Sequence, residues 1–188
     1  MTNYLRAISL SLFLMFVSHK ATAATFIVTE IPNGSIIKID GPIEEHDYDK
    51  FAYYLVMTPN IRTVILNSNG GLVVEGIRIG QLIHDRKLNT VIDKNEVCLS
   101  ICSLIFLSGD SKYIYKTSAL GVHTASNPKT KQRDDKANAM IAWYFGSLGY
   151  SPGIVEKWIF SEPYAINFIT YKDNVEFNLG ITSLDGQD

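Results

Sequence analysis

The sequence predicts a single α/β domain, because short β-branched runs alternate with stretches of helical periodicity through its middle. The clearest run, residues 63–66, is apolar or β-branched throughout and is typical of a strand buried on both faces of a parallel sheet. A helix is expected directly after it, over residues 72–84, where apolar side chains recur every three or four positions. No repeat or low-complexity tract divides the chain. These observations favour one domain built from strand–helix units.

Two strands and one helix are expected ahead of this unit. Residues 25–30 and 35–39 flank a Pro-Asn-Gly turn and predict a hairpin. Residues 44–57 have helical spacing, with acidic residues in the first turn and a proline just past the end. The N-terminal part of the domain is therefore expected to be a hairpin followed by a helix.

Three more strands and four more helices are expected in the rest of the chain. The strands are short apolar or β-branched runs at residues 89–93, 112–115 and 119–123. The helices are expected at residues 98–106, 134–148, 152–159 (with Ser151 as N-cap) and 173–179, and an exposed loop at 127–133. Gly76 and Gly80 lie four residues apart on one face of the helix expected at 72–84. Because glycine weakens a helix, that face should pack closely against another element.

The first 23 residues have the pattern of a secretory signal peptide. Arg6 precedes an apolar stretch at residues 7–17, and small residues lead up to Ala23. Cleavage after Ala23 would leave 188 − 23 = 165 residues, a domain over residues 24–188 in a periplasmic or secreted location. An uncleaved membrane anchor is the alternative, but the apolar stretch is shorter than the roughly 20 residues that a spanning helix needs. No later segment is long and apolar enough to span a bilayer.

Charge and cysteine content exclude several classes of function. Without the signal, 17 − 2 = 15 basic residues face 19 acidic ones, so nucleic acid is not an expected partner. Cys98 and Cys102 are the two cysteines, and export would favour a disulfide between them. On a helix their spacing would separate the Cα atoms by about 6 Å, within reach of a disulfide. No second Cys/His pair completes a metal site, so neither a metal nor a cofactor is expected.

Three features follow one another in the order that acyl-transfer chemistry requires. Gly70 and Gly71 come directly after a predicted strand, Ser100 follows about thirty residues later, and His123 ends another predicted strand. They could supply oxyanion donors, a nucleophile and a base. Each has an ordinary structural alternative, namely a tight turn, a helix cap and a structural histidine. Their joint order is more informative than any one of them.

Five motifs accompany these residues along positions 36–182: Ile39-Asp40-Gly41-Pro42-Ile43; Leu66-Asn67-Ser68-Asn69-Gly70-Gly71, with Glu75-Gly76 and Ile79-Gly80 after it; Cys98-Leu99-Ser100-Ile101-Cys102; Leu120-Gly121-Val122-His123; and Leu179-Gly180-Ile181-Thr182. In this combination the chain resembles the ClpP/crotonase superfamily. It is most similar to exported, stand-alone ClpP-like proteins that carry a Cys-X-Ser-X-Cys motif. The resemblance implies a ClpP/crotonase-like fold, with a mostly parallel sheet flanked by helices.

The resemblance also implies roles for individual residues. Ser100 would be the nucleophile and His123 the general base, while Gly70 or Gly71, with Ile101, would donate hydrogen bonds to the oxyanion. The implied function is an ATP-independent serine peptidase that acts on peptides or proteins through an acyl-enzyme. Because relatives commonly form rings or trimers, a homo-oligomer is among the partners that the resemblance allows.

The third member of the triad departs from the family pattern. In the family's peptidases an aspartate lies about a dozen residues before the final glycine, but here that count reaches Phe168, beside Asn167. Asn167 could orient the imidazole by a hydrogen bond, and Asp173 or Glu162 is the alternative.

Three other functions compete with a serine peptidase. Without a third member the domain could be an inactive binding or structural module. A crotonase-type acyl-CoA enzyme is disfavoured by export away from CoA. Thiol chemistry at Cys98 or Cys102 would need a free thiolate, which an oxidising compartment disfavours.

Overall fold

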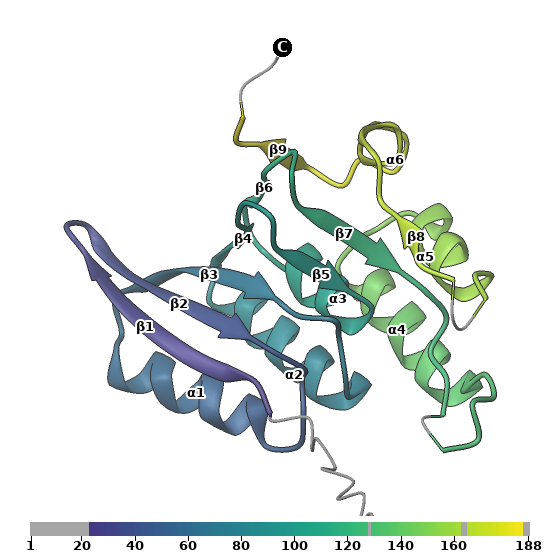
Figure 1. Ribbon diagram of the computed structural model, residues 1–188, viewed down its shortest axis with the longest axis horizontal. Coiled ribbons are helices and arrows are strands. Elements are labelled where there is room, and N and C mark those ends of the chain that lie inside the picture. The colour runs from purple at the N-terminus through teal and green to yellow at the C-terminus, as the bar shows by residue number, and fades with distance from the viewer. Residues whose placement is uncertain (1–22, 128, 163–164, 186–188) are drawn as a thin grey trace, which may run out of the picture.

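The computed structural model describes residues 23–127, 129–162 and 165–185 (Figure 1). The expected signal peptide lies outside these residues, apart from Ala23. In chain order the elements are β1 (Thr25–Ile31), β2 (Gly34–Asp40), α1 (Asp47–Met57), β3 (Ile61–Asn67), α2 (Val73–Asp85), β4 (Asn89–Ile92), β5 (Val97–Leu99), α3 (Ile101–Leu107), β6 (Lys112–Ile114), β7 (Ala119–Val122), α4 (Asp135–Ser147), α5 (Pro152–Ile159), β8 (Asn167–Phe168), α6 (Tyr171–Glu176) and β9 (Ile181–Ser183). Among the described residues no helix is long and apolar enough to cross a bilayer.

The strands form two sheets that meet at the end of β3. The larger sheet has the order β1-β2-β3-β4-β6-β9, in which only the β1–β2 hairpin is antiparallel. The smaller sheet has the order β5-β7-β8, with β5 parallel to β7 and β8 antiparallel to it. Ser68 joins the two sheets, because its N–H donates to Val97 (2.8 Å) and its carbonyl accepts from Leu99 (2.9 Å). The predicted α/β class and mostly parallel sheet are confirmed.

The helices cover the sheets on the side where the core lies. In Figure 1, α1 and α2 lie beneath β1–β3, and α3 and α4 continue the layer under the smaller sheet. All seven residues of α3 are buried, so this helix is the centre of the core. The prediction of a helix from Cys98 is wrong at its start, since residues 97–99 form the strand β5 and α3 begins at Ile101.

Local backbone conformation accounts for the other shifted boundaries. The helix expected from residue 44 begins at Asp47 because His46 adopts a left-handed conformation (φ 71°). Ser151 precedes α5 as expected, but its hydroxyl makes no capping hydrogen bond. The last helix begins two residues earlier than expected, because Thr170 caps it. The strands β5, β8 and β9 were not expected, since two or three residues carry too little periodicity.

Two glycines allow α2 to pack closely against α3 and α4, as the sequence predicted. A Cβ atom on Gly76 would lie 2.2 Å from Cγ1 of Ile101. One on Gly80 would lie 2.7 Å from Oγ of Ser108 and 3.1 Å from the hydroxyl of Tyr144. Glycine lowers the stability of the helix at these positions, but it allows close contact with α3, whose first residue follows Ser100.

Asp173 completes the cap of α6 and is held by a lysine. Its carboxylate accepts hydrogen bonds from the Thr170 N–H (2.7 Å) and hydroxyl (2.6 Å) and from Nζ of Lys157 (2.6 Å). Burial acts to raise the pKa of Asp173, but the hydrogen bonds from Lys157 and Thr170 outweigh it and hold that pKa below its ordinary value of 3.8. The charged form of Asp173 therefore stabilises the fold.

We expect Gly76→Ala to lower the free energy of unfolding by about 1–3 kcal/mol, because the added methyl group overpacks the α2–α3 contact. Gly146→Ala is the matched control, since a Cβ on this α4 residue would have no neighbour within 4 Å. The control should raise stability by up to about 1 kcal/mol through helix propensity. Urea unfolding measures both variants, and a Gly76→Ala protein as stable as the control would contradict the packing account.

We expect Asp173→Asn to lower stability by about 1–2 kcal/mol at neutral pH, because a charge-assisted cap is lost. A carboxyl with a depressed folded-state pKa contributes above its unfolded pKa and loses that contribution as the pH falls through the folded-state value. The difference between wild type and variant should therefore shrink in acid. Thermal unfolding across acidic and neutral pH tests this, and a difference that persists or grows in acid would refute it.

Candidate active site

Ser100 occupies a strained turn between β5 and α3. Its backbone (φ 56°, ψ −130°) lies where non-glycine residues are rare, at a cost on the order of 1–3 kcal/mol. Its N–H donates to the carbonyl of Gly121 (2.9 Å), and its carbonyl accepts from the Ser103 N–H (2.9 Å). The Ser100 hydroxyl makes no capping hydrogen bond to α3, unlike the usual serine at a helix start. The half-buried side chain is therefore held by its backbone and has no capping role.

A disulfide closes the turn around Ser100. Cys98 at the centre of β5 is bonded to Cys102 in the first turn of α3, with the Cα atoms 5.1 Å apart. Both residues are fully buried, and the described residues contain no free cysteine. A loop this short restricts the unfolded chain only modestly, by about 2 kcal/mol. Its larger consequence is local, because it ties the strand end to the helix start on both sides of Ser100.

The glycine loop packs directly on this turn. A Cβ on Gly70 (φ 101°) would lie 2.6 Å from Cβ of Ser100 and 2.9 Å from the carbonyl oxygen of Leu99. A Cβ on Gly71 (φ 149°) would lie 2.0 Å from the carbonyl oxygen of Ile43. Both glycines are required by close approach as well as by their backbone angles. The structure thus brings Gly70 and Ser100, thirty residues apart in sequence, into contact.

The hydrogen bonds of the loop distinguish the two glycines as oxyanion donors. The N–H of Gly70 donates to the hydroxyl of Ser68 (3.1 Å) and so already has a partner. Gly71 lies opposite Ile43 in a parallel bridge, but the two hydrogen bonds of the bridge are made by its neighbours. The N–H of Ile43 donates to the carbonyl of Gly70, and the N–H of Leu72 donates to the carbonyl of Ile43 (both 2.8 Å). In a parallel bridge the central residue turns its own N–H away from the partner strand. Gly71 is therefore the better donor of the two.

Ile101 offers a second N–H beside Ser100. It is the first residue of α3, where the N–H has no partner within the helix. The N–H groups of Gly71, which follows the residue packed on Ser100, and of Ile101, which follows Ser100 itself, are candidate donors to the negative oxygen of a tetrahedral intermediate.

His123 follows the end of β7, the strand that pairs with the strand leading to Ser100. The register aligns Leu99 with Gly121, two residues before His123. Its Nδ1 lies 2.9 Å from the carbonyl oxygen of Thr124. Because a carbonyl only accepts hydrogen bonds, Nδ1 must carry the proton of the neutral ring, which leaves Nε2 as the acceptor. A base that takes a proton from a serine needs this tautomer.

The expected third members lie in other surroundings. Asn167 pairs with Val122 across β7 and β8, and its amide donates to the carbonyl of Lys157 (3.5 Å). Residues directly opposite share a face and successive residues alternate, so the register puts Asn167 on the face of Val122 and not of His123. Asp173 is engaged in the α6 cap, and Glu162 is exposed. A hydrogen bond from Asn167 to the imidazole stays a prediction.

A polar network holds the start of β5 against the larger sheet. The amide of Asn67 donates to Asp40 (3.1 Å) and accepts from the N–H of Val97 (3.2 Å). Lys38 forms ion pairs with Asp40 (3.1 Å) and with Glu96. Burial acts to lower the pKa of Lys38, but its hydrogen bonds to Glu96 and Asp40 outweigh it and raise that pKa. The network fixes the position of the start of β5, the strand that leads to Ser100.

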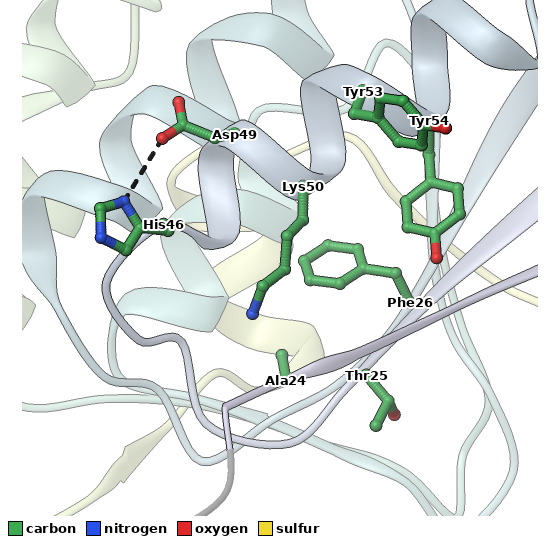
Figure 2. A pocket seen from close by; sticks show the side chains of 8 residues that line it. All are labelled: Ala24, Thr25, Phe26, His46, Asp49, Lys50, Tyr53 and Tyr54. Atoms are coloured by element: carbon green, nitrogen blue, oxygen red, sulfur yellow. Dashed lines mark ion pairs between the residues drawn. The ribbon is translucent and has the colours of Figure 1, made fainter.

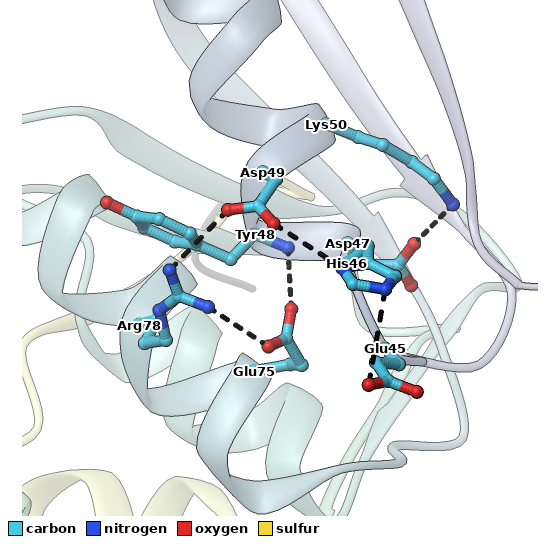
Figure 3. Close-up of polar contacts among 8 residues, drawn as sticks. All are labelled: Glu45, His46, Asp47, Tyr48, Asp49, Lys50, Glu75 and Arg78. Atoms are coloured by element: carbon cyan, nitrogen blue, oxygen red, sulfur yellow. Dashed lines mark hydrogen bonds and ion pairs between the residues drawn. The ribbon is translucent and has the colours of Figure 1, made fainter.

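A second polar network holds α2 against α1 (Figure 3). Buried Glu75 accepts from the N–H of Tyr48 (2.9 Å) and from Arg78 (3.2 Å), whose guanidinium lies 3.8 Å from the centre of the Tyr48 ring. Glu75 belongs to the motif after the glycine loop, and its hydrogen bonds hold the first turn of α2 against α1. Among the described residues no group of three or more potential metal ligands is present.

An open hollow on the described surface is lined by none of the candidate site residues. It lies between β1 and α1, has a volume of about 760 Å³, and is wide open to solvent (Figure 2). Its lining residues are Ala24, Thr25, Phe26, His46, Asp49, Lys50, Tyr53 and Tyr54. Since neither Ser100 nor His123 lines it, it is not part of the candidate site.

Comparison with solved structures identifies the fold. No protein-family model matches the chain, and no curated protein sequence matches it either. Its structure is similar to the 1510-N membrane protease specific for a stomatin homologue from Pyrococcus horikoshii (20% identity, 78% of this chain, 70% of that one, TM-score 0.54). A lysine-to-alanine variant of a stomatin-specific protease, in complex with a substrate peptide, has 17% identity over 77% of this chain and 72% of that one (TM-score 0.57). An enoyl-CoA hydratase from Bacillus anthracis has 13% identity over 85% of this chain and 70% of that one (TM-score 0.55). The chain has the ClpP/crotonase fold.

Proposed function

We propose that the protein is an exported serine peptidase in which Ser100 is the nucleophile and His123 the general base. The observation that carries the proposal is the strained strand-to-helix turn at Ser100, packed on Gly70 and closed by a disulfide. Strain of this kind persists only where the surrounding structure enforces it, and it is concentrated at functional sites. A serine that served only to cap α3 would need neither the strain nor the glycine contact.

The proposed mechanism uses the groups around this turn in sequence. Oγ of Ser100 attacks the substrate carbonyl while Nε2 of His123 takes its proton. The N–H groups of Gly71 and Ile101 donate hydrogen bonds to the developing negative oxygen, each stabilising the transition state by about 2.7–4 kcal/mol. His123 then returns the proton to the leaving amine, and a water molecule hydrolyses the acyl-enzyme by the reverse sequence.

The similar structures include a peptidase and an acyl-CoA enzyme, so the proposal depends on the residues of the site as well. This chain has similar TM-scores with the stomatin-specific protease in complex with a substrate peptide and with the enoyl-CoA hydratase. Both sequence identities are so low that they establish only a common fold. The serine at the turn favours acyl transfer to a side chain over chemistry on a CoA thioester. The proposed export points the same way, since it would remove the chain from the CoA pool.

The main alternative is a binding module that keeps the fold without hydrolysis. It is favoured by one observation, namely that the described hydrogen bonds of His123 include a backbone carbonyl and no carboxylate. A carbonyl orients the ring but adds no full negative charge to stabilise the imidazolium. The proposed enzyme should therefore be slower than one with an aspartate at this place.

We expect a fluorophosphonate probe to label the mature wild-type protein and Ser100→Ala to abolish labelling. His123→Ala should slow labelling by about a hundredfold or more, because the base is lost. Lys129→Ala and Lys136→Ala are controls for substitution near His123 in the chain, since both lysines are exposed. They should label at the wild-type rate. Labelling that survives Ser100→Ala would move the nucleophile elsewhere, and a folded wild type that never labels would favour the binding module.

We expect the protein recovered from the periplasm or medium, without reductant, to begin at Ala24. Its intact mass should be lower by two hydrogen atoms than that of the reduced chain, because Cys98 and Cys102 are bonded. Intact-mass spectrometry before and after reduction measures both properties. A full-length chain confined to the cytoplasm would refute the export, and two free thiols in exported protein would refute a stable disulfide.

A further inference from the structure

We propose that Asn138 is a positioning residue that sets the tautomer of His123 through one peptide group. The catalytic meaning of this role rests on the proposed function, but the hydrogen-bond chain itself does not. The chain runs from Nδ1 of His123 to the Thr124 carbonyl, through the peptide to the Ala125 N–H, and on to Oδ1 of Asn138. It would take the place of the missing third member.

Asn138 is one of the few buried polar residues, and every polar position of its amide is used. Its side chain is on α4, and the residue is 2% exposed. Oδ1 accepts from the N–H of Ala125 (2.9 Å) and from the hydroxyl of Thr124 (3.2 Å). Nδ2 donates to the carbonyls of Ala125 (3.1 Å) and Asp134 (2.8 Å). A rotated amide would set Nδ2 against an N–H and Oδ1 against two carbonyls, so its orientation is determined.

These bonds hold the segment that directly follows His123. Thr124 is 1% exposed, and the Ala125 carbonyl also accepts from the Asp134 N–H (2.9 Å). Both backbone groups of Ala125 and the hydroxyl of Thr124 are thus bonded to the start of α4. The Thr124–Ala125 peptide cannot turn without breaking bonds to a buried amide, at roughly 1–3 kcal/mol for each group left unsatisfied.

The geometry of a trans peptide then transmits the effect to His123. The carbonyl and the N–H of one peptide group point in opposite directions, so an acceptor on the N–H side fixes where the carbonyl points. Here Asn138 accepts from the Ala125 N–H, and the Thr124 carbonyl faces Nδ1 of His123 (2.9 Å). Successive hydrogen bonds also polarise the peptide between them and make its carbonyl a better acceptor. The result is a neutral ring with its proton on Nδ1 and a free Nε2.

The experiment measures the histidine tautomer directly, by nitrogen-15 NMR of the ring at a pH where it is neutral. Wild type should carry the proton on Nδ1 of His123. In Asn138→Ala the Nε2-protonated form should become substantially populated, and fluorophosphonate labelling should slow by about tenfold or more. Asn138→Asp keeps an acceptor for the Ala125 N–H, so it should restore the Nδ1 proton although it loses two donors.

Asn174→Ala is the matched control. Asn174 also bonds both backbone groups of one residue, since its amide donates to the Ile181 carbonyl (2.8 Å) and accepts from the Ile181 N–H (3.0 Å). It has no described bond to residues 123–125. The control should lose stability while it keeps the wild-type tautomer and labelling rate, which separates positioning from general destabilisation.

Two results would overturn the proposal. One is a wild type with the proton on Nε2, a measurement that does not depend on whether any variant folds. The other is a folded Asn138→Ala protein with the wild-type tautomer. A wild type that never reacts with the probe, yet loses its Nδ1 proton in Asn138→Ala, would support the positioning role while the proposed peptidase function failed.

Discussion

The contact between Gly70 and Ser100 is the constraint on which the rest of the site depends. A side chain at position 70 would overlap Cβ of Ser100, so the turn at Ser100 can have this conformation only with a glycine at position 70. The contact holds because Ser68 pairs with the strand before Ser100, and because Gly76 lets α2 approach Ile101, the residue after it. The turn is thus held from the strand side and from the helix side. Strain that would otherwise relax is kept in place by packing.

The disulfide and the buried polar groups act on the same turn from different directions. Cys98 and Cys102 join its two ends, and Ser103 places its hydroxyl within hydrogen-bond distance of the carbonyls of Cys98 (2.9 Å) and Gly121 (2.6 Å). On the other side, the Asn138 amide holds the segment after His123. Ser100 and His123 are therefore held by separate networks, joined by the pairing of β5 with β7. This division explains how a site without a carboxylate beside its histidine could still be ordered.

The sequence predicted the order of these parts better than their local geometry. The run that forms β3 is short but apolar and β-branched, and the one that forms α2 is long and periodic, so their type and place were predictable, as was the close packing at Gly76 and Gly80. β5 lies where the sequence predicts the start of a helix, because three apolar residues before a buried helix have no period of their own. Asn138 was missed for another reason. Three of its four partners are backbone groups of Ala125 and Asp134, which leave no trace in the side-chain pattern, whereas spacing from the final glycine points to Asn167.

The central claim is that Ser100, Gly71 and Ile101 form one site for a tetrahedral intermediate. A crystal structure of the protein after reaction with a peptidyl phosphonate tests it most directly, because the phosphonyl group imitates that intermediate. The account predicts a bond from phosphorus to Oγ of Ser100, with one phosphonyl oxygen within hydrogen-bond distance of the backbone nitrogens of both Gly71 and Ile101. A phosphonate bonded to another residue, or a phosphonyl oxygen turned away from both nitrogens, would contradict it.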